Sequence, residues 1–334
     1  MDPFTHGLLG AALPQATLRE KRLAPIAGLC GAVGAMAPDL DVLIVSDSEP
    51  LLFLEYHRQF THSLLFVPIG AFICTLALQV VLGRRWKLDF KHTYLFAVLG
   101  YATHPLLDAC TSYGTLVLWP FSDARIDWSI IAIIDPLFTV PLLAAVIFAT
   151  VKRQPWVARA GLAWCGIYLL LGLVQRESAE SMSAELAAKR GHSPSDIQAK
   201  PSFGNLLVWK TIYEAEGRFY VDAARVGIAP KVFEGSSIRQ LDLVRDFPWL
   251  QANTQQARDV ARFSWFSQYY VAQDATNPAR IIDIRYSLVP NDINALWSIT
   301  LDPAAGPDAH TPYQNHRRDV GESSRQLWKM LTEP

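Results

Sequence analysis

The sequence has few cysteines and lacks the spacings that build disulfide frameworks or zinc ribbons. Its four cysteines stand singly within or at the ends of apolar segments, and none lies in the second half of the chain. We interpret them as packing residues. The formal net charge is −1, so bulk charge gives no reason to expect a nucleic-acid partner. A Gly-rich phosphate loop, an internal repeat and a heptad run are also absent from the sequence.

Charged residues are scarce over roughly the first 175 positions, where long apolar runs dominate. A run such as "HSLLFVPIGAFICTLALQVVLG" is long enough to cross a bilayer. The opening "MDPFTHGLL" has an early acid and no basic n-region, so we do not expect a cleavable signal peptide. The candidate spans are residues 24–45, 62–83, 93–110, 129–151 and 158–175, with a shorter apolar stretch at 4–18.

The basic residues between the spans predict the topology. Lysines and arginines gather at 19–22, 84–91 and 152–159, whereas the connections 47–61 and 111–128 hold only Arg58 and Arg125 among several acids. Basic connections of this kind lie in the cytoplasm. A chain that starts on the cytoplasmic side and crosses the membrane five times ends on the outer side. We therefore expect a multi-pass protein of the bacterial inner membrane, with the chain from about 176 onward in the periplasm or outside the cell.

The second half has the pattern of a soluble domain. It opens with the polar helical stretch "RESAESMSAELAAKRGHSPSDIQAK", and strand-like alternation follows in "RFYVDAARV", "RIIDIRYSLV" and "ALWSITLD". We predict a helix for "QARDVARFSWFSQYY". The expected fold class is an all-α polytopic membrane bundle, with about five transmembrane helices and a short N-terminal helix, followed by an extramembrane α+β domain. The predicted domains are residues 1–175 and 176–334.

Ionisable side chains inside the predicted spans are costly in lipid, so each needs a buried partner or a function. His104 and Asp108 are four positions apart, which places them on one face of a helix. On the predicted topology, the ionisable residues of the spans share one level near the outer membrane face. The candidate metal ligands are His6, Asp39, His57, His62, His104 and Asp108.

Histidine and carboxylate ligands in an apolar bundle suit a divalent transition metal. Zinc is the first choice, and manganese or iron would suit a site with more oxygen ligands. The set is large enough for one, two or more ions. Two ions would lower the pKa of a bridging water and clamp the attacking and leaving oxygens of a phosphoester. Hydrolysis is therefore the reaction class that we expect.

Two acids and two arginines are candidates for other roles. Asp41 and Asp135 are the predicted catalytic residues, which would orient a ligand or act as general base. Arg58 and Arg125 are the predicted substrate-binding residues, because guanidinium groups clamp anions. The remaining histidines lie apart from the cluster in the sequence, and we leave them out of the site.

Simpler roles remain open for the residues of the first two spans. His6 could be an interfacial residue. Asp41 could belong to a helix-ending turn, since Pro and Asp in "PDLD" are turn formers. His57 and His62 could mark the membrane interface, where Arg58 would extend toward the headgroups.

The later candidates also have simpler roles. His104 and Asp108 could form a hydrogen bond within the span or a proton relay. Asp135 could bond backbone groups that Pro136 leaves free, or support a ligand histidine. The loop that holds Arg125 is rich in aromatic residues, which favours an interfacial belt for those aromatics.

Four segments of the first half resemble the successive signatures of a known family. The segments "THGLLGA", "PDLD", "HRQFTHSLL" and "GYATHPLLDACTSYGTLVLWPF" are similar to those of the YdjM-like family of membrane-bound metal-dependent hydrolases. The resemblance covers about residues 1–145, and its HRxxTHS and HxxxD elements in this order are fairly specific. It implies that the family's metal-binding positions are His6, Asp39, Asp41, His57, His62, His104 and Asp108.

A more distant similarity links this family to zinc-dependent phospholipase C and the S1/P1 nucleases. That resemblance implies phosphodiester or phosphomonoester substrates, by analogy of fold alone. The long C-terminal domain departs from the shortest family members. Inferences about substrate access are therefore not carried over.

The sequence as a whole predicts a membrane hydrolase of phosphoester or other ester bonds. A site at headgroup depth favours a lipid-linked or amphiphilic substrate, with membrane lipids as partners. The alternative is a non-enzymatic metal-binding or ion-transport protein. An ion path should continue to the cytoplasmic face, whereas the inner halves "LFAVLGY" and "AAVIFAT" offer no ionisable carboxylate or imidazole. A membrane half that only anchors a binding domain would leave the buried acids and histidines unexplained.

Overall fold

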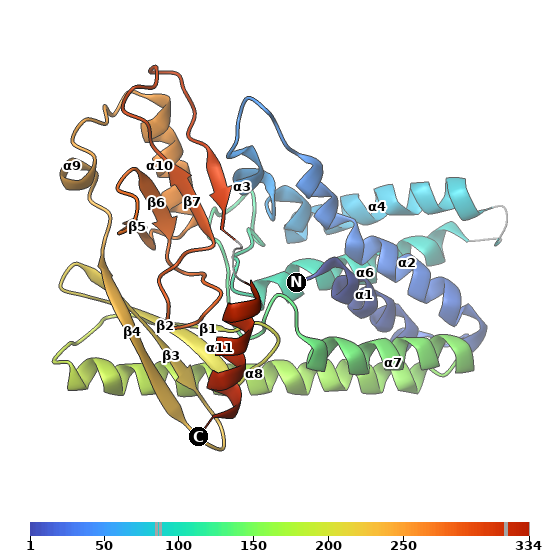
Figure 1. Ribbon diagram of the computed structural model, residues 1–334. Coiled ribbons are helices and arrows are strands. Elements are labelled where there is room, and N and C mark those ends of the chain that lie inside the picture. Colours follow the sequence, from blue (N-terminus) through green and yellow to red (C-terminus); the bar gives the residue numbers. More distant parts are fainter. Residues whose placement is uncertain (84–85, 87–88, 317–319, 334) are drawn as a thin grey trace. The chain divides into compact units, whose positions relative to one another are not determined.

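The computed structural model describes residues 1–334 except 84–85, 87–88, 317–319 and 334. The chain divides into two compact units. Unit 1 contains residues 1–43, 56–174 and 203–205, and unit 2 contains residues 44–55, 175–202 and 206–334. Unit 1 is built mainly from helices, whereas unit 2 contains antiparallel sheets and helices (Figure 1).

Unit 1 consists of helices joined by short helical turns. The helices are α1 (Pro3–Thr17), α2 (Ala24–Met36), α4 (Val67–Leu78), α6 (Phe90–Ala109), α7 (Pro136–Lys152) and the first part of α8 (Pro155–Lys189). The turns are η1 (Lys21–Leu23), η2 (Pro38–Leu43), η3 (Phe60–His62), η4 (Leu64–Phe66) and the π-helical η5 (Gln79–Gly83).

Aspartate caps set where three of these helices begin. Asp2, Asp89 and Asp135 precede α1, α6 and α7, and each carboxylate accepts hydrogen bonds from backbone N–H groups of the first turn. Pro3 and Pro136 follow two of these caps, at positions where a helix needs no N–H group. The sequence therefore specifies these helix starts locally.

Small residues let α1, α2 and α6 approach one another closely (Figure 1). A Cβ atom on Gly31 of α2 would lie 2.0 Å from the Gly10 carbonyl oxygen of α1. A Cβ atom on Gly100 of α6 would lie 2.0 Å from the Gly31 carbonyl oxygen. Only glycine permits such contact between helix backbones. This packing fixes α6, which carries His104 and Asp108, against α2, which leads into η2 with Asp39.

Three helical segments are long and apolar enough to cross a membrane. They are Lys21–Leu43, Leu64–Gly83 and Pro155–Lys189, and α7 is a shorter apolar helix. Large apolar side chains on α4 and α8 are exposed, including Ile69, Ile73, Ile167 and Leu170. Exposure of such an apolar surface to water is unfavourable, and lipid would cover it. The count of five spans stays a prediction, because α6 and α7 are not among these three segments.

Proline marks a change of helix type in one predicted span and a helix start in another. In 24–45, the α-helix ends at Met36 and η2 begins at Pro38, because proline lacks the N–H that an α-helix needs. In 129–151, α7 begins only at Pro136. Part of the basic connection 84–91 lies outside the described residues.

Unit 2 contains two four-stranded antiparallel sheets in which consecutive strands are neighbours. The first sheet has β1 (Ile197–Pro201), β2 (Val208–Ala215), β3 (Arg218–Arg225) and β4 (Lys231–Arg239), and the second has β5 (Val271–Gln273), β6 (Arg280–Asp283), β7 (Trp297–Thr300) and β8 (Tyr313–Asn315). The other elements are most of α3 (Leu52–Tyr56), the end of α8, α9 (Leu243–Asp246), α10 (Gln255–Phe266) and α11 (Val320–Thr332). Ile212 and Phe219 of the first sheet pack with Ala272 and Ile282 of the second in one core.

The predicted strands and the predicted helix of the second half are confirmed, with one correction. The three strand-like segments contain β3, β6 and β7, and "QARDVARFSWFSQYY" (256–270) contains α10 except for its first residue, Gln255. The polar stretch 176–200 is not one separate helix. Instead, α8 continues from the apolar half to Lys189, and residues 197–200 belong to β1. Gly191 has a φ of 79° and ends the helix, since it adopts a left-handed conformation.

Candidate metal centre

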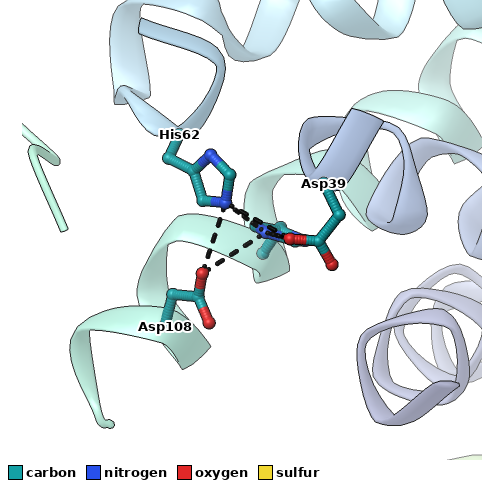
Figure 2. A group of neighbouring side chains, drawn as sticks. Asp39, His62 and Asp108 are labelled. Atoms are coloured by element: carbon teal, nitrogen blue, oxygen red, sulfur yellow. Dashed lines mark hydrogen bonds and ion pairs between the residues drawn. The ribbon is translucent and has the colours of Figure 1, made fainter. Parts of the chain in front are cut away.

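Four side chains from three segments of unit 1 meet in one group, the His/Asp cluster. Asp39 lies on η2, His62 ends η3, and His104 and Asp108 lie one turn apart on α6. One potential ligand atom from each lies within 4.8 Å of the others. Figure 2 shows the His62 imidazole directed toward the carboxylates of Asp39 and Asp108.

The two histidines of the cluster present their Nε2 atoms to each other at 2.8 Å. His104 Nδ1 lies 2.5 Å from the Ala35 carbonyl oxygen, which can only accept a hydrogen bond. His62 Nδ1 lies 3.2 Å from Asp41 Oδ2 and is held in the same way. In neutral rings both Nε2 atoms then carry lone pairs. Two lone pairs at this distance need a shared proton or metal ion.

The carboxylates complete the donor set. Asp108 Oδ2 lies 3.3 Å from His62 Nε2 and 3.5 Å from His104 Nε2. Asp39 Oδ1 lies 3.6 Å and 3.5 Å from the same two atoms. Asp108 is fully buried, yet its Oδ2 accepts no hydrogen bond from the described residues. A buried carboxylate oxygen needs a cation nearby, and Arg58 Nε, 3.2 Å away in an ion pair, already provides one.

This donor set fits a divalent metal ion. Two imidazole nitrogens and two carboxylate oxygens are the ligand types that zinc accepts. Zinc bonds of about 2.0 Å in a tetrahedron separate neighbouring ligand atoms by roughly 3.3 Å. The nitrogen-to-oxygen distances of 3.3 to 3.6 Å within the cluster are close to that value, whereas the two Nε2 atoms, 2.8 Å apart, are closer together than it. The cluster could therefore hold a metal ion.

His6 lies against the cluster without being one of its four members. Its Nε2 is 3.0 Å from Asp108 Oδ1, and its ring stacks on His104 with 3.7 Å between centroids. Its buried Nδ1 has no hydrogen-bond partner among the described residues. The amino group of Met1 also forms an ion pair with Asp108. His6 is therefore placed to bind a further ion or to support Asp108.

Asp41 connects His57 to the cluster. His57 Nδ1 donates to Asp41 Oδ1 at 2.7 Å, and Asp41 Oδ2 accepts from the Thr61 hydroxyl at 2.8 Å and the Arg58 backbone N–H at 3.0 Å. The same carboxylate faces His62 Nδ1. Both oxygens of Asp41 are thus engaged. This geometry suits a group that orients histidines better than a general base, which needs a free lone pair.

The two predicted substrate-binding arginines both lie over the Tyr113 ring. The guanidinium carbons of Arg58 and Arg125 are 4.6 Å and 5.6 Å from the ring centroid. Arg58 Nε lies 3.2 Å from Asp108 Oδ2, and its Nη1 donates to the Thr111 hydroxyl at 2.9 Å. The φ of Arg58 is 65°, a left-handed conformation that is uncommon for residues with a side chain. Arg58 is therefore held beside the cluster.

Asp135 is not brought to the cluster. Its Oδ1 accepts hydrogen bonds from the Leu137 and Phe138 backbone N–H groups at 3.1 Å and 3.3 Å. The Tyr168 hydroxyl of α8 donates to the same carboxylate at 2.8 Å. The residue caps α7 and links it to α8, in agreement with the simpler role of bonding backbone groups. A catalytic role for Asp135 stays a prediction.

Three residues with contacts around these groups were not among the candidates that the sequence suggested. Thr61 lies within "HRQFTHSLL", so its place between two candidate histidines was an available signal. Tyr113 lies in a Ser/Thr/Gly-rich loop, where nothing marks it as the neighbour of two arginines. Tyr168 lies inside an apolar run, and no local pattern pairs it with Asp135.

Comparisons with known proteins cover mainly the first half of the chain. A family model described as "YdjM inner membrane protein" matches residues 1–179. The chain is similar to "Uncharacterized protein YfhP" of Bacillus subtilis (strain 168), at 27% identity over 177 residues that cover 51% of each chain. It is also similar to "Inner membrane protein YbcI" of Escherichia coli (strain K12), at 35% identity over 121 residues that cover 35% of this chain and 67% of YbcI.

The matched relatives are longer than the region that they share with this chain. The chain spans about half the length of YfhP and two thirds of that of YbcI. No solved structure matches the chain significantly. The family match nevertheless contains the whole His/Asp cluster together with His6, Asp41 and His57.

Proposed function

This chain belongs to the YdjM inner membrane protein family, and we propose that it is an integral-membrane, metal-dependent hydrolase. One observation carries the proposal. The Nε2 atoms of His62 and His104 face each other at 2.8 Å, and both belong with Asp39 and Asp108 to one group of four potential ligands. A divalent ion bound among these atoms would supply Lewis-acid chemistry and an activated water, which suits ester hydrolysis.

Zinc is the metal that we propose, with manganese or iron as alternatives. The cluster offers equal numbers of nitrogen and oxygen donors, and manganese or iron would be favoured if more oxygen ligands took part. His6 and His57 adjoin the cluster through Asp108 and Asp41. They are the residues that would serve a second ion.

The surrounding residues would bind and position an anionic substrate. Arg58 and Arg125 place two guanidinium groups around Tyr113, and Arg58 also contacts Asp108 of the cluster. Guanidinium groups recognise phosphate oxygens through paired hydrogen bonds. Asp41 would keep His57 and His62 in the orientation that metal binding needs. A phosphoester is therefore the proposed substrate, with other esters as a broader class.

The substrate would be lipid-linked or amphiphilic. Asp39 lies within the candidate span Lys21–Leu43, and His62 lies just before the candidate span Leu64–Gly83. A site beside two such spans would be reached most directly from the membrane. In this proposal the protein is a multi-pass protein of the bacterial inner membrane, membrane lipids are its partners, and the C-terminal domain is periplasmic or extracellular.

Metal content is the first property to measure. The full chain would be purified in detergent, reconstituted with zinc, manganese or iron, dialysed and analysed for bound metal. Wild type should retain metal in near-stoichiometric amount, whereas His62→Ala and Asp108→Ala should lose it, because each removes a donor. His92→Ala is the matched control, since His92 lies on the same helix as His104 but is exposed and forms its only ion pair among the described residues with Asp89.

The metal-loaded protein would then be tested on an aryl phosphodiester and on phospholipid vesicles. Hydrolysis in wild type and in His92→Ala that is lost in the two cluster variants supports the hydrolase. Wild type that stays metal-free after reconstitution contradicts the metal site itself. Stoichiometric metal without any hydrolysis of either probe would favour the non-enzymatic metal-binding or ion-transport alternative.

A further inference from the structure

One segment of the first half packs with unit 2. Residues 44–55 belong to unit 2, whereas Leu43 before them and Tyr56 after them belong to unit 1. Leu51 and Leu54 in this segment are buried, at 0% and 2% exposure. The ring of Phe53 packs edge to face on Tyr313 of β8, with 5.2 Å between centroids. The segment is therefore anchored within the fold of unit 2.

Arg262 of α10 provides the ionic part of this anchor. Its Nε forms an ion pair with Glu55, and its Nη2 lies 3.7 Å from Glu49 Oε2. Its Nη1 lies 3.2 Å from Asp259 Oδ1 on the same helix. Asp259 is fully buried and also accepts a hydrogen bond from the Thr311 backbone N–H at 2.9 Å. Asp259 therefore fixes the guanidinium group of Arg262, which also contacts Glu49 and Glu55 of the segment.

The two ends of the segment lead directly to residues at the metal site. Asp41 lies just before Ile44, and His57 lies just after Glu55. His57 Nδ1 and Asp41 Oδ1 are joined by a hydrogen bond of 2.7 Å. The segment is therefore a loop that is closed at its base by the Asp41–His57 pair. Arg262 holds it close to the end that carries His57.

We propose that Arg262 is a positioning residue for the metal site. It orders the segment 44–55 through Glu55, and the ordered segment keeps the Asp41–His57 pair assembled. Because Asp41 also faces His62 Nδ1, a disordered segment would also disturb the orientation of His62 in the His/Asp cluster. Unit 2 would thereby set the metal affinity of unit 1 through the chain itself. Only the predicted effect of Arg262 on metal affinity rests on the proposed function.

Amide hydrogen exchange on the full chain in detergent tests the inference without reference to metal. Arg262→Ala should speed exchange in peptides covering residues 56–62 by roughly threefold or more, because local order falls when an anchoring contact is lost. Peptides covering β2 and β3, residues 208–225, should stay protected and report that unit 2 is folded. Arg258→Ala is the matched control, since Arg258 lies on the same helix and its guanidinium group hydrogen-bonds to the neighbouring Gln255 and Asn253.

Rescue and metal affinity complete the test. Arg262→Lys should restore part of the protection at 56–62, because it keeps the charge that faces Glu55. The zinc dissociation constant can be measured by competition with a chelator, and it should rise roughly threefold or more in Arg262→Ala. This effect is smaller than the 10-fold or greater loss of affinity that follows removal of a group bonded directly to a metal ligand. Arg258→Ala should leave the zinc dissociation constant unchanged.

Unchanged exchange at 56–62 in Arg262→Ala would overturn the inference. If residues 208–225 also lose protection, Glu55→Ala decides, because it removes one partner of Arg262 and leaves the Arg262–Asp259 contact in place. No acceleration in a folded Glu55→Ala variant would overturn the inference equally. If wild type binds none of zinc, manganese and iron, but Arg262→Ala still shows the expected faster exchange at 56–62, only the proposed function is contradicted. The role of Arg262 in holding the Asp41–His57 pair then stands.

Discussion

At the scale of single residues, Asp41 connects two histidines of the candidate site. Its Oδ1 accepts a hydrogen bond from His57 Nδ1 at 2.7 Å, and its Oδ2 lies 3.2 Å from His62 Nδ1. Each oxygen of this carboxylate therefore faces a different imidazole ring. Such contacts fix which nitrogen of each ring can face a metal ion.

Lys210 of β2 leads to a prediction about pH. The side chain is buried, its Nζ donates to Ser287 Oγ at 2.9 Å and to the Asp292 carbonyl oxygen at 2.8 Å, and burial lowers the pKa of Lys210 from 10.5 to about 7. Between these pH values the unfolded chain binds a proton that the folded chain does not. This residue therefore makes folding more favourable as pH rises from 7 to 10, with a slope of at most about 1.4 kcal/mol per pH unit.

Substitution by methionine removes this titration. The unfolding midpoint of Lys210→Met, relative to wild type, should therefore become progressively lower as pH rises from 7 to 10, and thermal unfolding of the full chain in detergent measures it. Lys231→Met on β4 is the control, because that side chain is exposed and its difference from wild type should stay constant. A constant difference for Lys210→Met would contradict the prediction.

At the scale of elements, local capping fixes where α1 and α7 begin, although the hydropathy of 129–151 alone placed the start of that span seven residues before Pro136. Aspartate followed by proline marks the first residues of α1 and α7, because capping is a short-range interaction. The continuation of α8 to Lys189 was missed, since the change from apolar to polar residues suggested a domain boundary. The backbone hydrogen bonds of a helix do not depend on that change.

The contact between α1 and α2 gives a prediction for one glycine. Gly31→Val should lower the unfolding midpoint and the bound metal together, because the new side chain would meet the backbone of α1 and displace the elements that carry Asp39 and His104. Gly166→Val on α8 is the control, since a Cβ atom there meets nothing within 4 Å. Thermal unfolding and metal analysis in detergent measure both effects. An unchanged midpoint and metal content in Gly31→Val would show that the helices can separate without cost.

At the scale of the whole molecule, the predicted topology can be tested by labelling. Glu216, on the turn between β2 and β3, and Arg153, after α7, are both exposed, and the four native cysteines are buried. A membrane-impermeant maleimide should label Glu216→Cys in intact spheroplasts. It should label Arg153→Cys only after lysis, because that connection is predicted to be cytoplasmic. Labelling of Arg153→Cys in intact cells, or protection of Glu216→Cys, would contradict the predicted topology.

The sequence by itself determined the helical character of the first half, several strands of the second half and the identities of the candidate ligands. It could do so because hydropathy, capping and the cost of ionisable groups in apolar runs act over short stretches of chain. Only the tertiary structure decided which candidates meet. The approach of His62 Nε2 to His104 Nε2 and the separation of Asp135 from the cluster depend on how α2, α6 and α7 pack. The assignment of residues 44–55 to unit 2 has the same cause, since contacts between distant segments form only when the whole chain folds.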